Sequence, residues 1–498
     1  MTMKSLAAVT VSGMLLVTSA CSRSSSAQGA RLGTIDFPTS GSAEAKPHFI
    51  RGVLFLHSFE YNAAATEFRR AQKADPGFAM AFWGEAMTHT HPVWNEQKVS
   101  EARTILNRLA ASRDARKAKA PTHREQMYLD AIETLYGEGS KARRDTLYSA
   151  SMKQLVDAHP EDLEAKVLYA LSLIGLNQGV RDVATYLRAG EIAEAIFKVN
   201  PDHPGAAHYV IHSYDDPAHA SLGLEAARAY SRIAPGAAHA QHMTTHIFLA
   251  LGMWDDVVSQ NEIASGHDHD SWTPGHYTQW LNYAYIQQGR YADALHMLER
   301  MGRSSGPAVA SMRARYLVDT ERWDAPVGSG EGLYWTFATG LKAVKNGDLP
   351  AARAALASVS KINAARGASL EEPDAILGLE MTALVMFAEG KRDEALALMK
   401  EATRREDAMP FDFGPPVIIK PSHELFGEML MEAGKPAEAH AEFLRALELA
   451  PKRARSLLGL ARAAKAKGDA SAAAKAYADL QAVWHRADPA VKSFAAGS

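Results

Sequence analysis

The chain has 498 residues, which is long enough for about two to four domains or for one long repeat array. Hydrophobic residues make up 47% of it and charged residues 22%, and both shares are ordinary for a globular protein. The net charge of -3 provides no basic field for a phosphate backbone, so we expect no nucleic-acid partner.

Residues 1–20 have the three-part plan of a secretory signal peptide. An apolar stretch from Leu6 to Val17 is too short to span a bilayer comfortably, and small residues then lead to Cys21, the only cysteine. The stretch "VTSAC" resembles a bacterial lipobox, although Thr18 is less typical at its position than Leu or Val. The resemblance implies that Cys21 is lipidated and becomes the mature N-terminus. A plain cleaved signal with an idle cysteine is the alternative.

The lipid anchor would be the only contact of the protein with a membrane. Multiple acyl chains give stable anchoring, and the serine-rich stretch that follows predicts a flexible linker over residues 21–46. Ser22, rather than Asp, follows the cysteine, which implies the outer membrane in bacteria whose sorting resembles the enterobacterial scheme. We therefore expect an exported lipoprotein that faces the periplasm and has no thiol left for disulfides or Cys-zinc sites.

Ala-rich stretches with apolar residues three and four positions apart run through the rest of the chain and predict helices. Two stretches, "RGVLFLHSFEYNAAATEFRRAQKADP" and "FGEMLMEAGKPAEAHAEFLRALELAP", carry small residues, an aromatic and a closing proline at tetratricopeptide spacing. Such units are pairs of antiparallel helices that bury their faces by stacking, so the sequence predicts an all-α, tetratricopeptide-type helical repeat array, an α-solenoid. The matching positions are Gly52, Phe55, Ala64, Phe68, Ala71 and Pro76, and then Gly427, Leu430, Ala439, Phe443, Ala446 and Pro451.

The repeats divide into two sections. Residues 47–303 match the repeat pattern irregularly, and residues 333–498 match it more regularly. Over residues 304–332 the periodicity breaks and glycines recur, so we expect a joint there. The stretch "GSGEGL" in this joint is not a phosphate loop, since no strand precedes it and no Gly-Lys-Ser/Thr follows. We therefore expect no nucleotide cofactor.

Half of the chain's 20 histidines fall in one central seventh of the sequence. His208 and His212 are four positions apart and share one helix face; His242 and His246 do the same, and His239 continues their stripe. If both helices are the first helices of consecutive repeats, the stripes face one solvent-accessible groove and form a ligand set for zinc, copper, nickel or iron. The alternative is that these rings are structural and hydrogen-bond backbone carbonyls.

Further side chains are candidates for the edge and the opposite wall of this groove. Asp215 and His219 lie at a predicted helix end, where they would supply an extra ligand or accept a hydrogen bond from one. The stretches "LHSFEY" and "WGEAMTHTHPVW" offer a second cluster, which a curved array would bring across from the first. The stretch "GHDHDSWTPGH" is either a metal-binding loop or a solvated turn, and Glu85 is alternatively a salt-bridge partner. The members of the second cluster are His57, Glu60, Glu85, His89 and His91.

Three long stretches, beginning "LHSFEYNAAATEF", "NPDHPGAAHYVIH" and "PFDFGPPVIIKPSHELF", resemble a group of bacterial exported tetratricopeptide proteins. The similarity covers nearly all of the chain after the linker. It implies the fold and the export, but it assigns no catalytic role and no role to the histidines. Tetratricopeptide arrays in general bind peptides or protein surfaces in their concave groove, so the resemblance also implies a protein or peptide ligand.

Three functions follow from these observations. The first, which we adopt as the prediction, is a membrane-anchored scaffold that binds a protein or peptide and has a His-lined groove for a transition metal. The second is a metal-dependent enzyme of the cell envelope, an oxidoreductase or a hydrolase. The third is an accessory protein of envelope transport or assembly. Convergence of the imidazoles distinguishes them, because a pure adaptor does not need so many histidines in so short a stretch.

Overall fold

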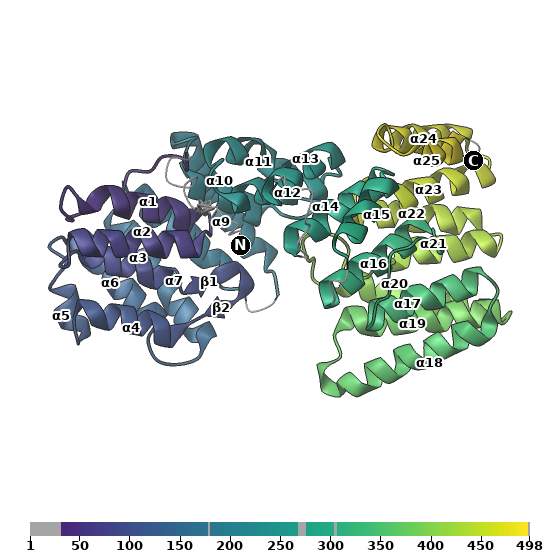
Figure 1. Cartoon of the computed structure of the whole chain (residues 1–498), viewed down its shortest axis with the longest axis horizontal. Coiled ribbons are helices and arrows are strands. Elements are labelled where there is room, and N and C mark those ends of the chain that lie inside the picture. The colour runs from purple at the N-terminus through teal and green to yellow at the C-terminus, as the bar shows by residue number, and fades with distance from the viewer. Residues whose placement is uncertain (1–30, 178–179, 267–274, 303–305, 497–498) are drawn as a thin grey trace, which may run out of the picture.

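The computed structural model describes residues 31–177, 180–266, 275–302 and 306–496 (Figure 1). The predicted signal peptide, residues 1–20, and Cys21 lie outside the described residues. The described chain is helical almost throughout, and successive helices pack against one another along the sequence, as predicted. Among these helices, none combines the length and the apolarity that crossing a membrane requires.

Helices α1 to α9 form the first part of the array, at the purple and blue end of the chain in Figure 1. Each helix contacts mainly its neighbours in sequence, as stacked helix pairs do. A short hairpin interrupts them, in which β1 (Thr90–His91) and β2 (Glu96–Gln97) pair antiparallel around the 3₁₀ turn η1 (Pro92–Trp94). The helices are α1 (Ala45–His57), α2 (Tyr61–Ala74), α3 (Ala79–Met87), α4 (Val99–Leu109), α5 (Arg113–Lys117), α6 (His123–Leu135), α7 (Lys141–Ala158), α8 (Leu163–Ile174) and α9 (Val183–Val199).

Helices α10 to α16 continue the array without a break. The first helices of three successive pairs are α10, α12 and α14. For α10 and α12 this is the arrangement on which the predicted ligand set depends. The predicted joint, residues 304–332, contains α16, which packs against α14, α15 and α17, because its glycines flank the helix instead of interrupting it. The helices are α10 (Pro204–Ser213), α11 (Ala220–Ile233), α12 (Ala238–Ala250), α13 (Trp254–Ala264), α14 (His276–Gln287), α15 (Tyr291–Arg300) and α16 (Pro307–Thr320).

Helices α17 to α25 lead away from the central helices and then return to them. The indole N–H of Trp484 donates to the carbonyl of Gln287, and that of Trp254 donates to the carbonyl of Lys452, both at 3.1 Å. The end of the chain therefore packs on the middle of the array. The elements are α17 (Leu333–Lys345), α18 (Leu349–Arg366), the 3₁₀ turn η2 (Gly367–Ser369), α19 (Glu372–Ala388), α20 (Arg392–Ala408), α21 (Ser422–Glu432), α22 (Pro436–Leu449), α23 (Ala454–Ala466), α24 (Ala470–Val483) and α25 (Pro489–Ala496).

Small residues allow the paired helices to approach each other, as the repeat signature predicts. A Cβ atom added at Gly52 would lie 2.7 Å from the ring of Phe68, and one at Gly427 would lie 2.8 Å from the ring of Phe443. Both phenylalanines are fully or almost fully buried. The aromatic ring thus fills the space that the missing side chain leaves, which makes the fold a tetratricopeptide-type array of helix pairs.

The described part of the predicted linker, residues 31–44, is packed against the array, unlike the flexible tether that we expected. Leu32 and Phe37 are both buried. The ring of Phe37 lies between those of Trp83 and Tyr128, with centroids 5.8 and 5.2 Å away. The correction has a simple cause, since two apolar side chains in an otherwise polar stretch gain by leaving water.

Candidate metal centre

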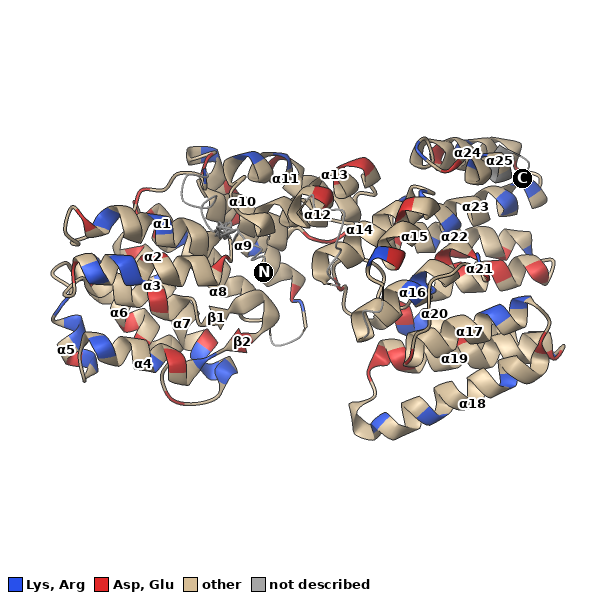
Figure 2. Ribbon diagram, in the orientation of Figure 1, with Lys and Arg blue, Asp and Glu red and all other residues tan. Residues whose placement is uncertain are grey.

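The central helices α10, α12 and α14 carry the imidazoles. None of the three contains a lysine, an arginine, an aspartate or a glutamate, and they lie in the tan central part of Figure 2. Nearly every residue of α10 and α12 is buried. The histidines are therefore the basic side chains of these three helices.

Six imidazoles gather there, and they include all five of the principal metal ligands that the sequence predicts. The sixth is His276, the first residue of α14. Their nitrogen atoms form two groups, each with three donors within 4.8 Å of one another. Within the groups the ring centroids are 4.7 Å apart for His208–His212, 5.1 Å for His208–His239, 5.1 Å for His242–His246, 4.6 Å for His242–His276 and 6.3 Å for His246–His276. Between the groups they are 6.0 Å apart for His212–His246 and 6.4 Å for His239–His242.

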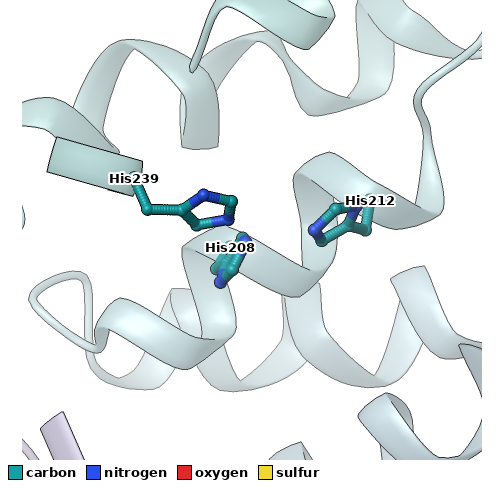
Figure 3. A group of neighbouring side chains, drawn as sticks. All are labelled: His208, His212 and His239. Carbon is teal, nitrogen blue, oxygen red and sulfur yellow. The ribbon is translucent and has the colours of Figure 1, made fainter. Parts of the chain in front are cut away.

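The first group consists of His208, His212 and His239 (Figure 3). His208 and His212 project from adjacent turns of α10, and His239 projects from the start of α12 toward the same space. The Nδ1–H of His208 donates to the carbonyl of His57 at 2.6 Å, which leaves the lone pair on Nε2. The Nε2 atoms of all three rings are buried and have no hydrogen-bond partner.

The second group consists of His242, His246 and His276. The Nδ1–H of His242 donates to Oδ1 of Asn261 at 2.8 Å, and that of His246 donates to Oδ2 of Asp215 at 2.5 Å. These bonds place the lone pair of both rings on Nε2, and the two Nε2 atoms are 3.3 Å apart. A metal-binding histidine usually donates one ring N–H to an acceptor of the protein, which orients the ring and leaves the other nitrogen for the metal. His242 and His246 have this arrangement.

Five of the six imidazoles have lowered pKa values, which favour the neutral form. Burial first, and neighbouring imidazoles second, lower the pKa of His208, His212, His239 and His242 well below the ordinary value of 6.5. Loss of hydration, and then His246, lower the pKa of His276 to about 4. Neutral imidazole is the form that binds a metal ion, so the groups are competent ligands at neutral pH.

Aromatic rings enclose the imidazoles. The ring of Phe59 lies 4.3 Å from that of His208, and the ring of Trp280 lies 4.3 Å from that of His246. Phe59 has a φ of 54°, in the left-handed region that a bulky residue adopts at a cost of about 1–3 kcal/mol. This strain places the Phe59 ring against all three members of the first group.

A third group, His57, Glu164 and His203, is fully buried, and its carboxylate lies within ion-pair distance of both rings. Nδ1 of His203 accepts from the backbone N–H of Ala206, so its proton lies on Nε2, 3.1 Å from Glu164. Nε2 of His57 donates to Glu164 at 2.8 Å. Burial alone would raise the pKa of Glu164, but His203 and His57 lower it to about 2. His57 therefore contributes to the centre through its backbone carbonyl, which orients His208. Its ring does not form the predicted opposite wall of the groove.

The rest of the predicted opposite wall does not meet the imidazoles. Glu85, on α3, is buried and accepts hydrogen bonds from Gln72 on α2 and Arg108 on α4. His89 follows α3 and belongs to neither group. For Glu85 the alternative interpretation, a salt-bridge partner, is the correct one. The reason is that the side chains of Arg108 and Gln72 already occupy its carboxylate.

The remaining candidates lie around the site, but they belong to neither group of imidazoles. Glu60 accepts the backbone N–H of His239 at 3.2 Å, which fixes the start of α12. His91 pairs with Glu96 at 2.9 Å, and His219 pairs with Asp216 at 2.8 Å. Asp215 is the predicted edge residue that does contact a ring of the groups.

Access to the imidazoles is narrower than the open groove that we expected. Five of the six rings are buried, and the segment of residues 409–421, between α20 and α21, lies against them. Its Phe413 ring is 5.1 Å from that of His246. Cavities of about 150 and 430 Å³ flank this segment: His246 lines the first, His212 lines the second, and Asp215 lines both.

His276 and Asn261 are the contributors that sequence reasoning missed. "GHDHDSWTPGH" was open to two interpretations; its residues 267–274 lie outside the described residues, whereas its last histidine begins α14. A signal was present, because His208, His242 and His276 recur at an interval of 34 residues, the length of a tetratricopeptide unit. Asn261 had no such signal.

Comparisons with known proteins give no family for this chain. No protein family and no curated protein matches it. Solved structures match at low similarity: the human IFIT1 dimer with m7Gppp-AAAA (14% identity, 89% of this chain and 96% of that chain, TM-score 0.34) and the P58(IPK) TPR domain (14%, 86% and 99%, 0.24). The APC/C hetero-tetramer Cut9-Hcn1 matches at 12% identity over 90% of this chain and 76% of that chain, with a TM-score of 0.32. At such scores the fold assignment rests on the helix pairs of the chain itself.

Proposed function

We propose that the protein is a transition-metal-binding helical repeat protein whose metal centre is built from the imidazoles of α10, α12 and α14. The observation that carries the proposal is the pair of Nε2 atoms of His242 and His246, 3.3 Å apart, with both Nδ1–H groups already committed. Two neutral rings in this state present lone pairs to each other, which is unfavourable. A cation between them removes the conflict.

The separation of these two nitrogens suits one tetrahedral ion. Nitrogens that each lie about 2.0–2.1 Å from a zinc ion in tetrahedral coordination are about 3.3–3.4 Å from each other. The observed 3.3 Å falls at this edge length without any rearrangement. A proton on Nε2 of His246, paired with Asp215, would also relieve the contact, so the proposal needs a direct test for metal.

A purely structural role for the rings is costly. A buried polar atom without a hydrogen bond costs about 1–3 kcal/mol, and the Nε2 atoms of His208, His212 and His239 are three such atoms. Their rings have donor nitrogens within 4.8 Å of one another. A metal ion would satisfy them together. An all-imidazole donor set favours zinc, copper, nickel or iron over magnesium or calcium, which take oxygen ligands.

The repeat array and the N-terminus support a location and a partner class. In our proposal the chain is an exported lipoprotein, anchored through Cys21 at the periplasmic face of the outer membrane, and its array binds a protein or peptide. The support is the sequence: the signal-like residues 1–20, the lipobox-like "VTSAC" and the tetratricopeptide spacing. A role as an accessory protein of envelope transport or assembly is compatible with the same features.

A metal-dependent enzyme is the second candidate function, and the two cavities favour it. A storage or structural site can be closed, whereas a catalytic site needs an open position and a route for substrate. His246 and His212 each line a cavity, so each group has a member that a small molecule can reach. An oxidoreductase or a hydrolase of the cell envelope would fit this geometry.

The test is metal analysis of protein purified without a His tag. We expect a transition metal to copurify or to bind on addition, and to be lost in the His208→Ala/His246→Ala variant, which removes one ligand from each group. The matched control is His123→Ala/His159→Ala, which removes two adjacent imidazoles outside the centre, with centroids 5.7 Å apart. Wild-type protein that binds no transition metal would refute the proposed function.

A further inference from the structure

The six imidazoles form two separate ligand sets and not one. Among the described residues, three imidazoles of each set have their donor atoms within 4.8 Å of one another: His208, His212 and His239 in one, and His242, His246 and His276 in the other. We propose that the centre holds two transition-metal ions, one on each group, and that a small anionic oxygen donor such as hydroxide bridges them. This inference rests on the proposed function, because it specifies how many ions that site binds.

Both groups are prepared for an ion in the same way. In the first group the Nδ1–H of His208 is used by a backbone carbonyl, and in the second the Nδ1–H groups of His242 and His246 are used by side-chain oxygens. In each case Nε2 is directed into the group. An ion that satisfied only the second group would leave the three buried Nε2 atoms of the first without a partner.

Three protein ligands leave a position open on each ion. Three imidazoles with water or substrate in the fourth position are the usual ligand set of a catalytic zinc site. Because His212 and His246 are neighbours across the two groups, with centroids 6.0 Å apart, the two ions would lie side by side in the space between α10 and α12. Paired ions in proteins act together on the oxygen atoms that lie between them.

Charge balance argues for an anionic bridge. Two divalent ions bring four positive charges to neutral imidazoles on helices that contain no acidic residue. Asp215 is the one described carboxylate that hydrogen-bonds a ligand ring, through His246. Buried charge is costly unless it is compensated, so a hydroxide or a similar anion between the ions would stabilise the pair.

The cavities provide access to both ions. His246 of the second group lines the 150 Å³ cavity, His212 of the first lines the 430 Å³ cavity, and Asp215 lines both. A small anion can thus reach each group from its own side of the segment 409–421. This arrangement suits two open coordination positions better than one closed structural ion.

Metal stoichiometry tests the inference. Chelator-treated protein is titrated with Cu²⁺, and the bound metal is measured per chain after gel filtration. We expect two ions in the wild type and in the His123→Ala/His159→Ala control. We expect one ion in His208→Ala/His212→Ala, one in His242→Ala/His246→Ala, and none when all four are replaced. Circular dichroism identifies variants that do not fold. If the variants fail to fold, the number of copper ions bound per wild-type chain decides between one ion and two.

The possible failures are distinguishable. One ion per chain, lost in either double variant, would overturn the two-ion centre and leave the proposed function intact, whereas no bound metal would overturn both. Azide is the probe for the bridging position, and its binding is followed by the absorption spectrum. One azide should bind per two Cu²⁺ ions in the fully loaded wild type and one per ion in each double variant, and one azide per ion in the wild type would overturn the bridge. A hydroxide bridge couples two Cu²⁺ spins antiferromagnetically, so the loaded wild type should show far less electron paramagnetic resonance intensity than its copper content. Two ions per chain with full, uncoupled intensity would overturn their adjacency.

Discussion

Acidification should destabilise the metal-free protein, because its buried imidazoles resist protonation. The pKa values of His208, His212, His239 and His242 lie well below 6.5 in the folded protein, chiefly because of burial. In the unfolded chain the same groups take up protons near pH 6.5. Below that pH the unfolded state binds more protons than the folded state, so the free energy of unfolding falls as the pH falls.

The size of the effect follows from the number of imidazoles. At pH 5.5 each ring that stays neutral in the folded protein costs about 1.4 kcal/mol, so these four remove about 5–6 kcal/mol relative to pH 7.5. Globular proteins have total stabilities of about 5–15 kcal/mol. Glu406 acts in the opposite direction, because burial raises its pKa to about 7 and its folded form therefore gains a proton as the pH falls.

Comparing the pH dependence of the free energy of unfolding in the wild type and in a variant cancels the contributions of groups such as Glu406. The His208→Gln/His242→Gln variant should lose about 3 kcal/mol less than the wild type between pH 7.5 and 5.5, since two neutral rings are gone. Urea unfolding of chelator-treated protein, followed by tryptophan fluorescence, measures the difference, and Trp280 reports directly because its ring lies 4.3 Å from His246. Equal pH dependence in the two proteins would refute the reasoning. Replacing His123 and His159 by Gln is the control.

Three further substitutions test the hydrogen bond to a ligand ring, the packing of the helix pairs and the lipid anchor. Asp215→Ala should weaken metal binding by about 10–100-fold in competition with a chromogenic chelator, because a ligand ring loses its acceptor; unchanged affinity would show that the carboxylate plays no such part. Gly84→Ala should destabilise the array by about 1–3 kcal/mol in thermal melts, since the new Cβ would lie 2.3 Å from Phe68. Gly77→Ala, where the nearest atom is 3.6 Å away, should not, and equal losses would contradict the packing argument. Cys21→Ser should move the protein from the membrane to the soluble fraction, and unchanged partitioning would contradict lipidation.

The fold was predictable because the repeat signature is local. Positions such as Gly52 and Phe68 touch each other within one helix pair, so their spacing in the sequence carries the geometry. The return of the chain end onto the central helices was not predictable in this way. It depends on contacts such as that between Trp484 and Gln287, which lie far apart in sequence and show no periodicity.

The candidate site was predictable where it follows the helix and the repeat. A spacing of four placed His208 with His212 and His242 with His246, and consecutive first helices brought the two pairs together. Acceptors such as Asn261 come from second helices and have no spacing that links them to the ligands. The covering segment 409–421 lies still further away in sequence, so burial of the rings could not be inferred.

The repeat also explains why the cluster stops where it does. One unit after His246 the equivalent position is Trp280, whose ring covers His246 at 4.3 Å instead of extending the stripe. One unit before His239 the equivalent position is Gly205, where a Cβ would lie 2.4 Å from Nδ1 of His57. A side chain at that position would displace His57, whose carbonyl orients His208. The same 34-residue period thus relates His208, His242 and His276, and it places one tryptophan and one glycine where two further imidazoles would otherwise stand.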